Sequence, residues 1–402
     1  VCVDNNQDKV DLINNGVSPI HEDGLNELLR GNIGNRLKSS INLHDAVINS
    51  DVSLIAVGTP FDGSLIDLSY VQQVSKEIGL SIKKKDNYHV VIVKSTVVPG
   101  TTDDVITPLL EKYSGKKAGK DFGVGMNPEF LREGAAVDDF MNPDKIVIGS
   151  LDKDTTDFVK NIFVHFKNKC EFIETNLESS ELIKYTNNAF LATKISFINS
   201  IANICQNIPN TDVKTITYAI GKDPRIGPQF LNAGPGFGGS CLPKDLSALI
   251  NFSKKIHNES LILKSVKAIN DDQPKKIINL IEKMGVFKKR NTISVLGVAF
   301  KKNTDDIRES KSISLVKILL RNGIKIKVHD PMALNNFKKI FKNRIEYCDT
   351  ISDAISQSHC CIIMTGWDEY KNLKIENFET NMKKVNIIDA QRILNPKKFK
   401  NI

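Results

Sequence analysis

Short apolar runs separated by helical patterns place the strongest limit on how this chain folds. In the first part of the chain they read VSLIAVGTP (52–60), HVVIVKST (89–96), DFGVGMNP (121–128) and KIVIGS (145–150). Four more follow at 291–300, 324–331, 360–367 and 384–391. Strands that are apolar along almost their whole length are buried on both faces, as in a parallel sheet covered by helices. The pattern therefore predicts an α/β fold with two doubly wound parallel sheets.

The middle of the chain has a different pattern. Residues 179–205 contain no glycine or proline and carry apolar residues at helical spacing, which predicts one long helix. Helical patterns continue to about Lys283. We therefore expect three parts: a first α/β domain over 1–175, a central helical domain over 176–285, and a second α/β domain over 286–402.

The first residues indicate an incomplete first domain. Val1–Val3 read as a short strand that ends in Asp4, followed by a helix from about Asn6 to Gly16. In a dinucleotide-binding βαβ unit, an acidic residue at the end of the second strand binds the ribose, about 20 residues after a glycine loop. Asp4 fits that acidic position. We expect that the first strand and its glycine loop are missing from this sequence.

A second glycine-rich stretch, GPGFGGSCLPKD (234–245), matches G-x-G-x-x-G through Gly234, Gly236 and Gly239. A cofactor loop of this kind leaves a buried strand and enters a helix. The preceding residues, RIGPQFLNA, are broken by glycine and proline and do not read as a strand, so the dinucleotide interpretation is disfavoured.

The same stretch favours a reactive cysteine. Pro243 predicts the first turn of a helix, which places Cys241 at the helix N-terminus. The helix dipole and the neighbouring Lys244 favour a thiolate there. The alternative is that Cys241 is a small packing residue.

Other polar residues stand at positions suited to a site. In NPEFLREG, Asn127 and Pro128 predict a helix start that puts Glu129 and Glu133 on one face; the alternative is a solvated first turn. Lys184 and Asn188 share a face of the long helix and suit an oxyanion clamp, unless the lysine reaches to solvent.

Three cations follow strands of the last domain. Lys301 and Arg308 lie after the strand at 291–300, and Arg392 follows the strand that ends at Asp389. Ligands of α/β sheets bind at the carboxyl ends of strands, so these cations favour a phosphate site over plain surface charge.

Composition argues against several classes of protein. The 402 residues carry a net charge of +8, but their lysines occur in small groups without interleaved aromatic residues, so we expect no nucleic-acid partner. No apolar run approaches the roughly 18 residues of a membrane span, and no leader pattern opens the chain. The seven cysteines and seven histidines show neither C-x-x-C nor metal-ligand spacing, so we expect no metal, no disulfide framework and a cytoplasmic location.

With these motifs in order, the chain resembles the UDP-glucose/GDP-mannose dehydrogenase family from end to end. The matching stretches are VGTP, KSTVVPGTT, NPEFLREG, IKYTNNAFLATKISF, DPRIGPQFLNAGPGFGGSCLPKD, GVAFKKNTDDIRES and IIDAQR. The resemblance implies two Rossmann-like domains around a long central helix, a homodimer, and NAD as cofactor. It also implies oxidation of a nucleotide sugar to the acid through a cysteine thiohemiacetal and thioester.

The resemblance assigns roles by motif. It implies that the catalytic residues are Cys241 as nucleophile, with Lys184, Asn188, Asp245, Glu129 and Thr96. It implies that the residues around NAD are Asp4, Lys9, Gly58, Thr59, Ser95, Glu133, Lys244 and Arg308. It implies that the residues around the sugar nucleotide are Phe130, Leu131, Arg132, Arg225, Asn232, Ala233, Gly234, Gly236, Phe237, Gly238, Lys301 and Arg392.

The substrate is left between two branches of the family. RIGPQFLNAGPGFGGSC resembles the UDP-glucose branch, whereas SGKKAGKDFGVGMNPEFLRE is closer to the GDP-mannose branch. We favour UDP-glucose because the first segment surrounds the sugar. GDP-mannose oxidation and a non-catalytic nucleotide-sugar-binding protein are the alternatives.

Overall fold

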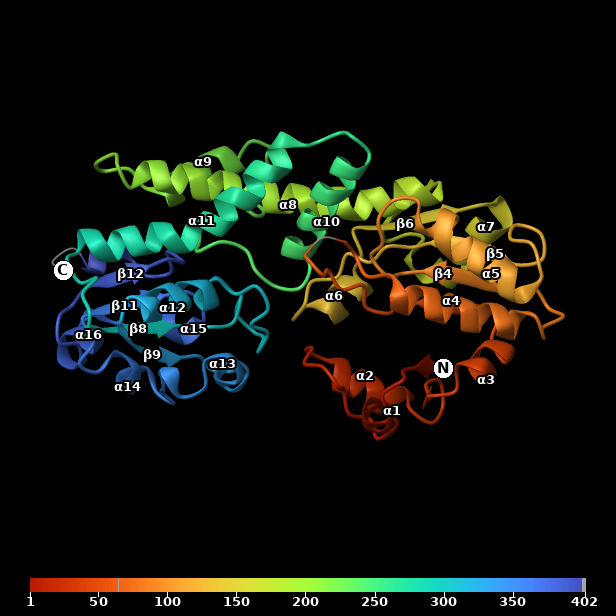
Figure 1. The fold of residues 1–402 in the computed structure, drawn as a ribbon, viewed down its shortest axis with the longest axis horizontal. Helices are drawn as coiled ribbons and strands as arrows, with labels where there is room; N and C mark the ends of the chain where they lie inside the picture. The colour runs from red at the N-terminus through yellow and green to blue at the C-terminus, as the bar shows by residue number, and fades with distance from the viewer. Residues whose placement is uncertain (64, 400–402) are drawn as a thin grey trace. The chain divides into compact units, whose positions relative to one another are not determined.

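The computed structural model describes residues 1–63 and 65–399, which form two compact units (Figure 1). The first unit is Val1–Asn187, and the second comprises the described chain from Asn188 onward. Both are α/β units, as the sequence predicts. The division into three domains with boundaries at 175 and 285 stays a prediction.

The first unit contains a five-stranded sheet in the order β3-β4-β5-β6-β7. These strands are β3 (Val52–Ile55), β4 (Val90–Val93), β5 (Gly123–Met126), β6 (Lys145–Ser150) and β7 (Glu171–Thr175). Its helices are α1 (Gln7–Asn14), α2 (Leu25–Asn32), α3 (Leu43–Ile48), α4 (Ser69–Ile82), α5 (Thr107–Ser114), α6 (Ala136–Met141) and α7 (Lys153–Ile162). Short turns of π- and 3₁₀-helix are η1 (Thr102–Ile106) and η2 (Val164–Phe166).

The fully apolar strands explain the layers of this sheet. Successive side chains point to opposite faces. Val91 and Val93 of β4 pack in the cluster formed with α3, α4 and α5, whereas Val90 and Ile92 pack in the cluster formed with α7. Because both faces are covered, every residue of β4 is buried.

One pairing differs from the expected parallel sheet. β6 runs antiparallel to β5, with Met126 opposite Gly149. A parallel return requires a crossover, usually a helix of a dozen or more residues. The segment between the two strands holds only the six-residue α6, so the chain turns back against β5 instead.

A separate two-stranded parallel sheet, β1 (Cys2–Val3) with β2 (Ser39–Ser40), lies at the start of the first unit. Both residues of β1 are exposed, and Leu54 on the edge strand β3 is half exposed. Asp4 follows β1, and Asn6 caps α1 by accepting a hydrogen bond from Lys9 N. The missing first strand and glycine loop stay a prediction.

The long predicted helix is α8 (Leu177–Cys205), which has 29 residues. Its Ala189 and Ala192 pack with residues of two other helices, α10 (Leu242–Lys255) and α11 (Leu261–Lys283). Figure 1 shows α10 and α11 beside α8. These helices carry the residues that the sequence analysis singled out around Cys241.

The second unit ends in a five-stranded parallel sheet in the order β10-β9-β8-β11-β12, the arrangement of a Rossmann-like half. The strands are β8 (Thr292–Leu296), β9 (Lys325–His329), β10 (Glu346–Tyr347), β11 (Cys360–Ile363) and β12 (Ile387–Asp389). The remaining helices are α9 (Val213–Gly221), α12 (Lys311–Arg321), α13 (Leu334–Phe341), η3 (Lys342–Arg344), α14 (Ile351–Ile355), α15 (Asp368–Lys371), α16 (Ile375–Asn381) and η4 (Pro396–Phe399).

The predicted helix start at Asn127 is wrong. Residues 127–134 are irregular, and α6 begins only at Ala136. Asn127 is buried, and its side chain accepts from Lys94 Nζ and donates to Val147 O instead of capping a helix. Glu129 and Glu133 therefore do not share a helical face.

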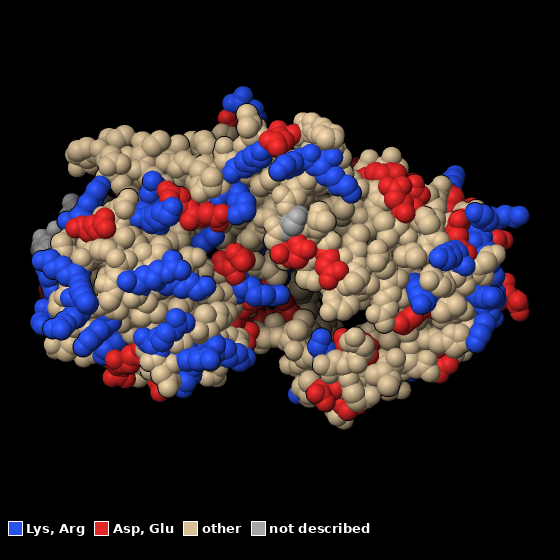
Figure 2. Space-filling model, in the orientation of Figure 1, with Lys and Arg blue, Asp and Glu red and all other residues tan. Residues whose placement is uncertain are grey.

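The charged surface is mixed. On the face shown in Figure 2, lysine and arginine side chains on the second unit are scattered among uncharged and acidic ones. Among the helices of the described residues, none combines the length and apolar character that a bilayer crossing requires.

Candidate functional site

Cys241 lies where the sequence predicts it. It is the N-cap residue of α10, whose first turn contains Pro243 and Asp245. Its side chain is exposed, and Ser240 Oγ lies 3.5 Å from the sulfur. The first N–H groups of a helix and its dipole face an atom at this position, so developing negative charge is stabilised there. Exposure removes the alternative of a buried packing cysteine.

A buried polar cluster supports the same turn of α10. Asp245 is 1% exposed. Its Oδ2 accepts from Asn188 Nδ2 at 2.6 Å, and its Oδ1 lies 2.7 Å from Lys244 Nζ. A buried carboxylate is costly unless it is paired and hydrogen-bonded. Asn188 and Lys244 together offset the cost of burying the Asp245 carboxylate. The backbone of Asp245 also contacts the cysteine: its N–H donates to Cys241 O at 2.8 Å.

The glycine loop at 234–239 is fixed by two buried asparagines. Gly234 N donates to Asn199 Oδ1 at 2.8 Å, and Phe237 N donates to Asn270 Oδ1 at 2.7 Å. Gly236 and Gly239 have φ of +108° and +83°, which side chains rarely adopt. A Cβ on Gly239 would lie 2.7 Å from the Phe300 ring, and one on Gly238 would lie 2.6 Å from Glu309 O.

In the first unit, Lys184 and Glu129 form an ion pair. The side chain of Lys184 is 4% exposed, which excludes the alternative that it reaches to solvent. Its Nζ donates to Glu129 Oε1 at 2.8 Å and to Glu129 O at 2.5 Å. The ammonium also lies 5.3 Å from the centre of the Phe130 ring.

Lys94 is a neighbouring residue that the sequence analysis missed. Its Nζ donates to Asn127 Oδ1 at 2.8 Å and lies 5.8 Å from the Phe163 ring centre. Burial lowers the pKa of Lys94 to about 8; the charge of Glu129 opposes this shift and that of Lys184 adds to it. The signal in the sequence was a lysine directly after the apolar strand β4, at a carboxyl strand end.

Glu181 of α8 is a second missed residue. It is completely buried and accepts from Gly100 N at 2.6 Å, from Thr102 N at 2.8 Å and from Thr102 Oγ1 at 2.6 Å. Burial raises the pKa of Glu181 to about 7, although these three donors oppose the shift. Glu181 therefore anchors the loop after Thr96 to helix α8.

Four of the residues predicted for the cofactor, Asp4, Gly58, Thr59 and Ser95, follow strands of the first unit. Asp4 follows β1, and its Oδ2 lies 3.6 Å from Lys9 Nζ. Thr59 Oγ1 donates to Thr96 O at 2.8 Å, and Ser95 Oγ donates to Val57 O at 2.7 Å. A Cβ on Gly58 would meet nothing within 4 Å. An acidic group at a strand end and this open, hydrogen-bonded turn fit the ribose of a dinucleotide.

Other predicted cations are held by local carboxylates. Arg132 pairs with Asp139, Arg225 with Asp223 and Arg308 with Asp306, each at 2.6 Å. Lys301 Nζ lies 5.4 Å from the Phe300 ring centre. Leu131 and Asn232 are exposed, and Glu133 is half-buried.

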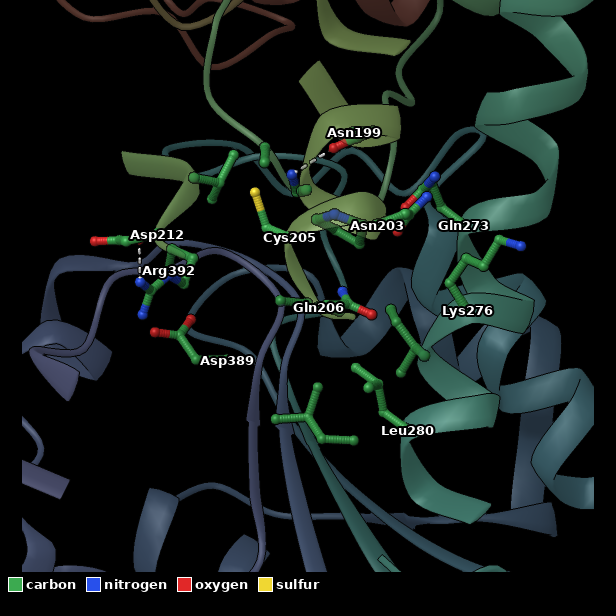
Figure 3. Close-up of a pocket in the computed structure, with 18 of the residues that line it drawn as sticks. Asn199, Asn203, Cys205, Gln206, Asp212, Gln273, Lys276, Leu280, Asp389 and Arg392 are labelled. Carbon is green, nitrogen blue, oxygen red and sulfur yellow. Dashed lines mark hydrogen bonds and ion pairs between the residues drawn. The ribbon is translucent and has the colours of Figure 1, made fainter. Parts of the chain in front are cut away.

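Arg392 lines a pocket of about 260 Å³ within the second unit (Figure 3). Its guanidinium pairs with Asp212. Burial alone would raise the pKa of Asp212, but hydrogen bonds from Arg392 and from Lys214 N outweigh it and lower that pKa. Ala233 and Gly234, also predicted to touch the sugar nucleotide, line the same pocket.

Three family models match successive parts of the chain. The UDP-glucose/GDP-mannose dehydrogenase family, NAD binding domain, matches residues 1–167. The central domain of this family matches 178–272, and its UDP binding domain matches 294–396.

Individual relatives agree with these matches. UDP-glucose 6-dehydrogenase AglM of Haloferax volcanii is 40% identical over 98% of this chain and 91% of its own length. The solved UDP-glucose dehydrogenase of Pyrobaculum islandicum is 34% identical, with a TM-score of 0.88 over 96% of this chain and 90% of that one. The solved GDP-mannose dehydrogenase of Pseudomonas aeruginosa is also 34% identical, with a TM-score of 0.54 over 98% of this chain and 91% of that one.

The close packing of the glycine loop gives a first prediction. Gly239→Ala combines a positive φ with a clash against Phe300, so we expect a loss of about 2–4 kcal/mol in the free energy of unfolding. Gly234→Ala is the matched control, because its Cβ would approach nothing closer than 3.7 Å. We expect that control to change the free energy by about 0.5 kcal/mol or less. Denaturant titration of both variants makes the comparison, and equal effects would contradict the described loop.

Proposed function

Because the chain belongs to the UDP-glucose/GDP-mannose dehydrogenase family, we propose that it catalyses the NAD-dependent four-electron oxidation of UDP-glucose to UDP-glucuronate. One observation carries the proposal: an exposed Cys241 at a helix N-terminus, supported by the buried cluster of Asn188, Lys244 and Asp245. A dehydrogenase that stops at an aldehyde needs no such nucleophile.

The cysteine accounts for the second oxidation. The first removes a hydride and a proton from the C6 alcohol and leaves an aldehyde. Cys241 sulfur then adds to the aldehyde carbon, forming a thiohemiacetal whose C–H bond can lose a second hydride. The resulting thioester is hydrolysed by water, which releases the carboxylate and the free thiol. When bound, NAD⁺ would supply the hydride acceptor for each oxidation.

The remaining side chains have the chemistry that these steps need. Asn188 Nδ2 and the Lys184 ammonium are donors four residues apart on α8, so they lie on one helical face and suit an oxyanion. Asp245 and Glu129 are carboxylates bonded to those two donors, and we assign them to moving protons and orienting water. Thr96 is also proposed as one of the catalytic residues.

The cofactor and substrate residues are assigned in the same way. Asp4, Lys9, Gly58, Thr59, Ser95, Glu133, Lys244 and Arg308 are proposed around NAD. Phe130–Arg132, Arg225, Asn232–Gly234, Gly236–Gly238, Lys301 and Arg392 are proposed around the sugar nucleotide. Arg225 is free to turn toward a ligand at little cost, because its pair with Asp223 is solvent-exposed.

Two alternatives remain testable against this proposal. GDP-mannose is the other substrate of the family, and the Pseudomonas aeruginosa enzyme is as similar in sequence as the archaeal UDP-glucose dehydrogenase. A non-catalytic sensor of nucleotide sugars would keep the fold. Such a sensor has no use for Cys241.

A homodimer is the proposed assembly. Phe190, Phe197 and Ile204 recur every seven residues on α8, and their exposed fractions are 63%, 53% and 54%. A seven-residue apolar repeat makes one continuous stripe along a helix, which pairs well with a copy of itself. The proposed compartment is the cytoplasm, where the seven free thiols would stay reduced; fractionation that finds the protein elsewhere would contradict this.

Removal of the sulfur tests the enzymatic proposal. We expect the wild-type protein to release two NADH per UDP-glucose and to use GDP-mannose less efficiently. Cys241→Ala should lose the second of the two NADH and slow the formation of UDP-glucuronate by roughly 10⁴-fold or more, as when a covalent nucleophile is removed. Cys170→Ala, at a half-buried cysteine, is the matched control and should keep activity. NADH absorbance reports both, and full turnover by Cys241→Ala would remove the assigned role.

A charge in the α8 stripe tests the assembly. Phe197→Glu should convert a dimer to a monomer, because a carboxylate would be buried without a partner. Leu80→Glu changes a similarly exposed apolar residue, 44% exposed, on α4 and should leave the mass unchanged. Light scattering gives the mass of each variant. A wild-type monomer, or a dimer that tolerates Phe197→Glu, would contradict the proposed interface.

A further inference from the structure

Glu181 is a buried acid of α8 to which the catalytic assignment gives no role. Its side chain is completely buried, although a carboxylate is rarely buried unless it is paired or well hydrogen-bonded. It stands three residues before Lys184, so the two side chains lie on one face of α8. A buried acid about one turn from a proposed catalytic lysine is a candidate for a role in the site.

Three donors from one loop surround the Glu181 carboxylate. Gly100 N donates to Oε2 at 2.6 Å, and Thr102 N and Oγ1 donate to Oε1 at 2.8 and 2.6 Å. Because all three groups donate, they fit the ionised carboxylate, which only accepts. A hydrogen bond to an ionised acceptor is about twice as strong as one between neutral groups. The loop is therefore held firmly against α8.

The same donors form the start of a helix. Gly100 and Thr102 lie where η1 begins, and η1 continues directly into α5. The residue at the cap position, Thr101, makes no side-chain cap; its hydroxyl donates to Val98 O instead. The first N–H groups of a helix need acceptors, and the helix dipole favours a carboxylate there. Glu181 supplies this acceptor from another helix.

Thr96 lies between this contact and a second anchor. At the near end of the loop, Thr59 Oγ1 donates to Thr96 O at 2.8 Å. The next residue, Val97, is completely buried. Thr101 N then donates to Val98 O at 3.1 Å, which closes a tight turn. The backbone around Thr96 is therefore fixed from both ends of the loop.

The same turn of α8 also binds the loop that follows the neighbouring strand. Lys184 Nζ donates to Glu129 Oε1 at 2.8 Å and to Glu129 O at 2.5 Å. Glu129 follows β5 and Thr96 follows β4, and these two strands pair side by side. Glu181 and Lys184 thus join the loops of two adjacent strands to one turn of one helix. That turn sets the position of Thr96 relative to Glu129.

We propose that Glu181 is a positioning residue for the oxidation, whose ionised carboxylate holds the loop after β4 so that Thr96 stays in register with Glu129. The inference rests on the proposed function, since Thr96 and Glu129 are assigned to catalysis only there. Glu181 acts through Thr96 and does not touch the substrate or the cofactor. Misplacing a catalytic group by about 1 Å can slow a reaction by about 100-fold, so the chemical steps should depend on this contact more than substrate binding does.

Glu181→Gln tests the proposal at nearly constant volume. The amide has one acceptor oxygen, so its Nε2 must face either Gly100 N or Thr102 N, and that N–H loses its acceptor. For NADH release by the full chain with UDP-glucose and NAD⁺, we expect kcat to fall by roughly 10- to 100-fold and KM for UDP-glucose to change by less than about threefold. Glu178→Gln removes the same charge from an exposed residue of α8 and should change neither constant.

A second substitution, Thr96→Ala, distinguishes positioning from general weakening of the fold. If Glu181 acts through Thr96, then Glu181→Gln should lower kcat by less than about twofold once residue 96 is alanine. A residue that only stabilises the fold would lower kcat by the same factor in both backgrounds. Thr102→Val removes only the hydroxyl donor and should lower kcat by about three- to tenfold. It carries the same test if Glu181→Gln does not fold.

The outcomes separate this inference from the proposed function. If the wild-type protein releases NADH and Glu181→Gln keeps its kcat, or lowers it equally in both backgrounds, the positioning role is wrong and the enzyme assignment stands. The same holds if Thr96→Ala leaves kcat unchanged, or if Glu181→Gln does not fold and Thr102→Val keeps the wild-type kcat. A wild-type protein that releases no NADH with UDP-glucose would contradict the proposed function, and this inference with it.

Discussion

The hydrogen bond from Asn188 Nδ2 to Asp245 Oδ2 is the contact on which the candidate site depends most. It is buried and 2.6 Å long, and it joins the long helix α8 to the first turn of α10. Lys244 supplies the balancing charge. Without these partners a carboxylate at 1% exposure would be strongly destabilising. With them, the turn is fixed and Cys241 is held at the start of α10.

The glycines before Cys241 follow from the same constraint. Their spacing matches the pattern of a cofactor loop, yet no strand precedes them within 222–240. They lie in an irregular segment anchored by Asn199 and Asn270, with ring and backbone atoms against Gly238 and Gly239. Glycine is needed at 238 and 239 because neighbouring atoms leave no room for a Cβ at either position. The spacing of the glycines alone could not distinguish a loop packed closely against its neighbours from a loop that binds a phosphate.

Much of the fold was predictable because it depends on local signals. Strands such as β4 are apolar throughout, and β4 lies inside the predicted run 89–96. The helix α8 lacks any breaker and was predicted within two residues at each end. The antiparallel direction of β6 was not predicted, because it follows from the short connection between β5 and β6. The irregular 127–134 segment was not predicted either, because it depends on distant partners. An asparagine before a proline, as at Asn127, is typical of a helix N-cap. Its side chain instead forms hydrogen bonds with Lys94 Nζ and Val147 O.

The same limit applied to the site. Cys241 and Lys184 stood out because a helix N-terminus and a lysine on an apolar helix face are readable patterns. Lys94 and Glu181 were not predicted. Burial shifts the pKa of each side chain, and the sequence does not show which charged residues are buried.

The most direct test of the central claim is to look for the covalent intermediate on Cys241. The full chain with Asp245→Asn, incubated with UDP-glucose and NAD⁺ and then quenched in acid, should accumulate a thioester because hydrolysis is slowed. Peptide mass spectrometry should find the UDP-glucuronyl group on the peptide that contains Cys241 and on no other cysteine. Release of two NADH per sugar by that variant with no adduct on Cys241 at any time would contradict the account.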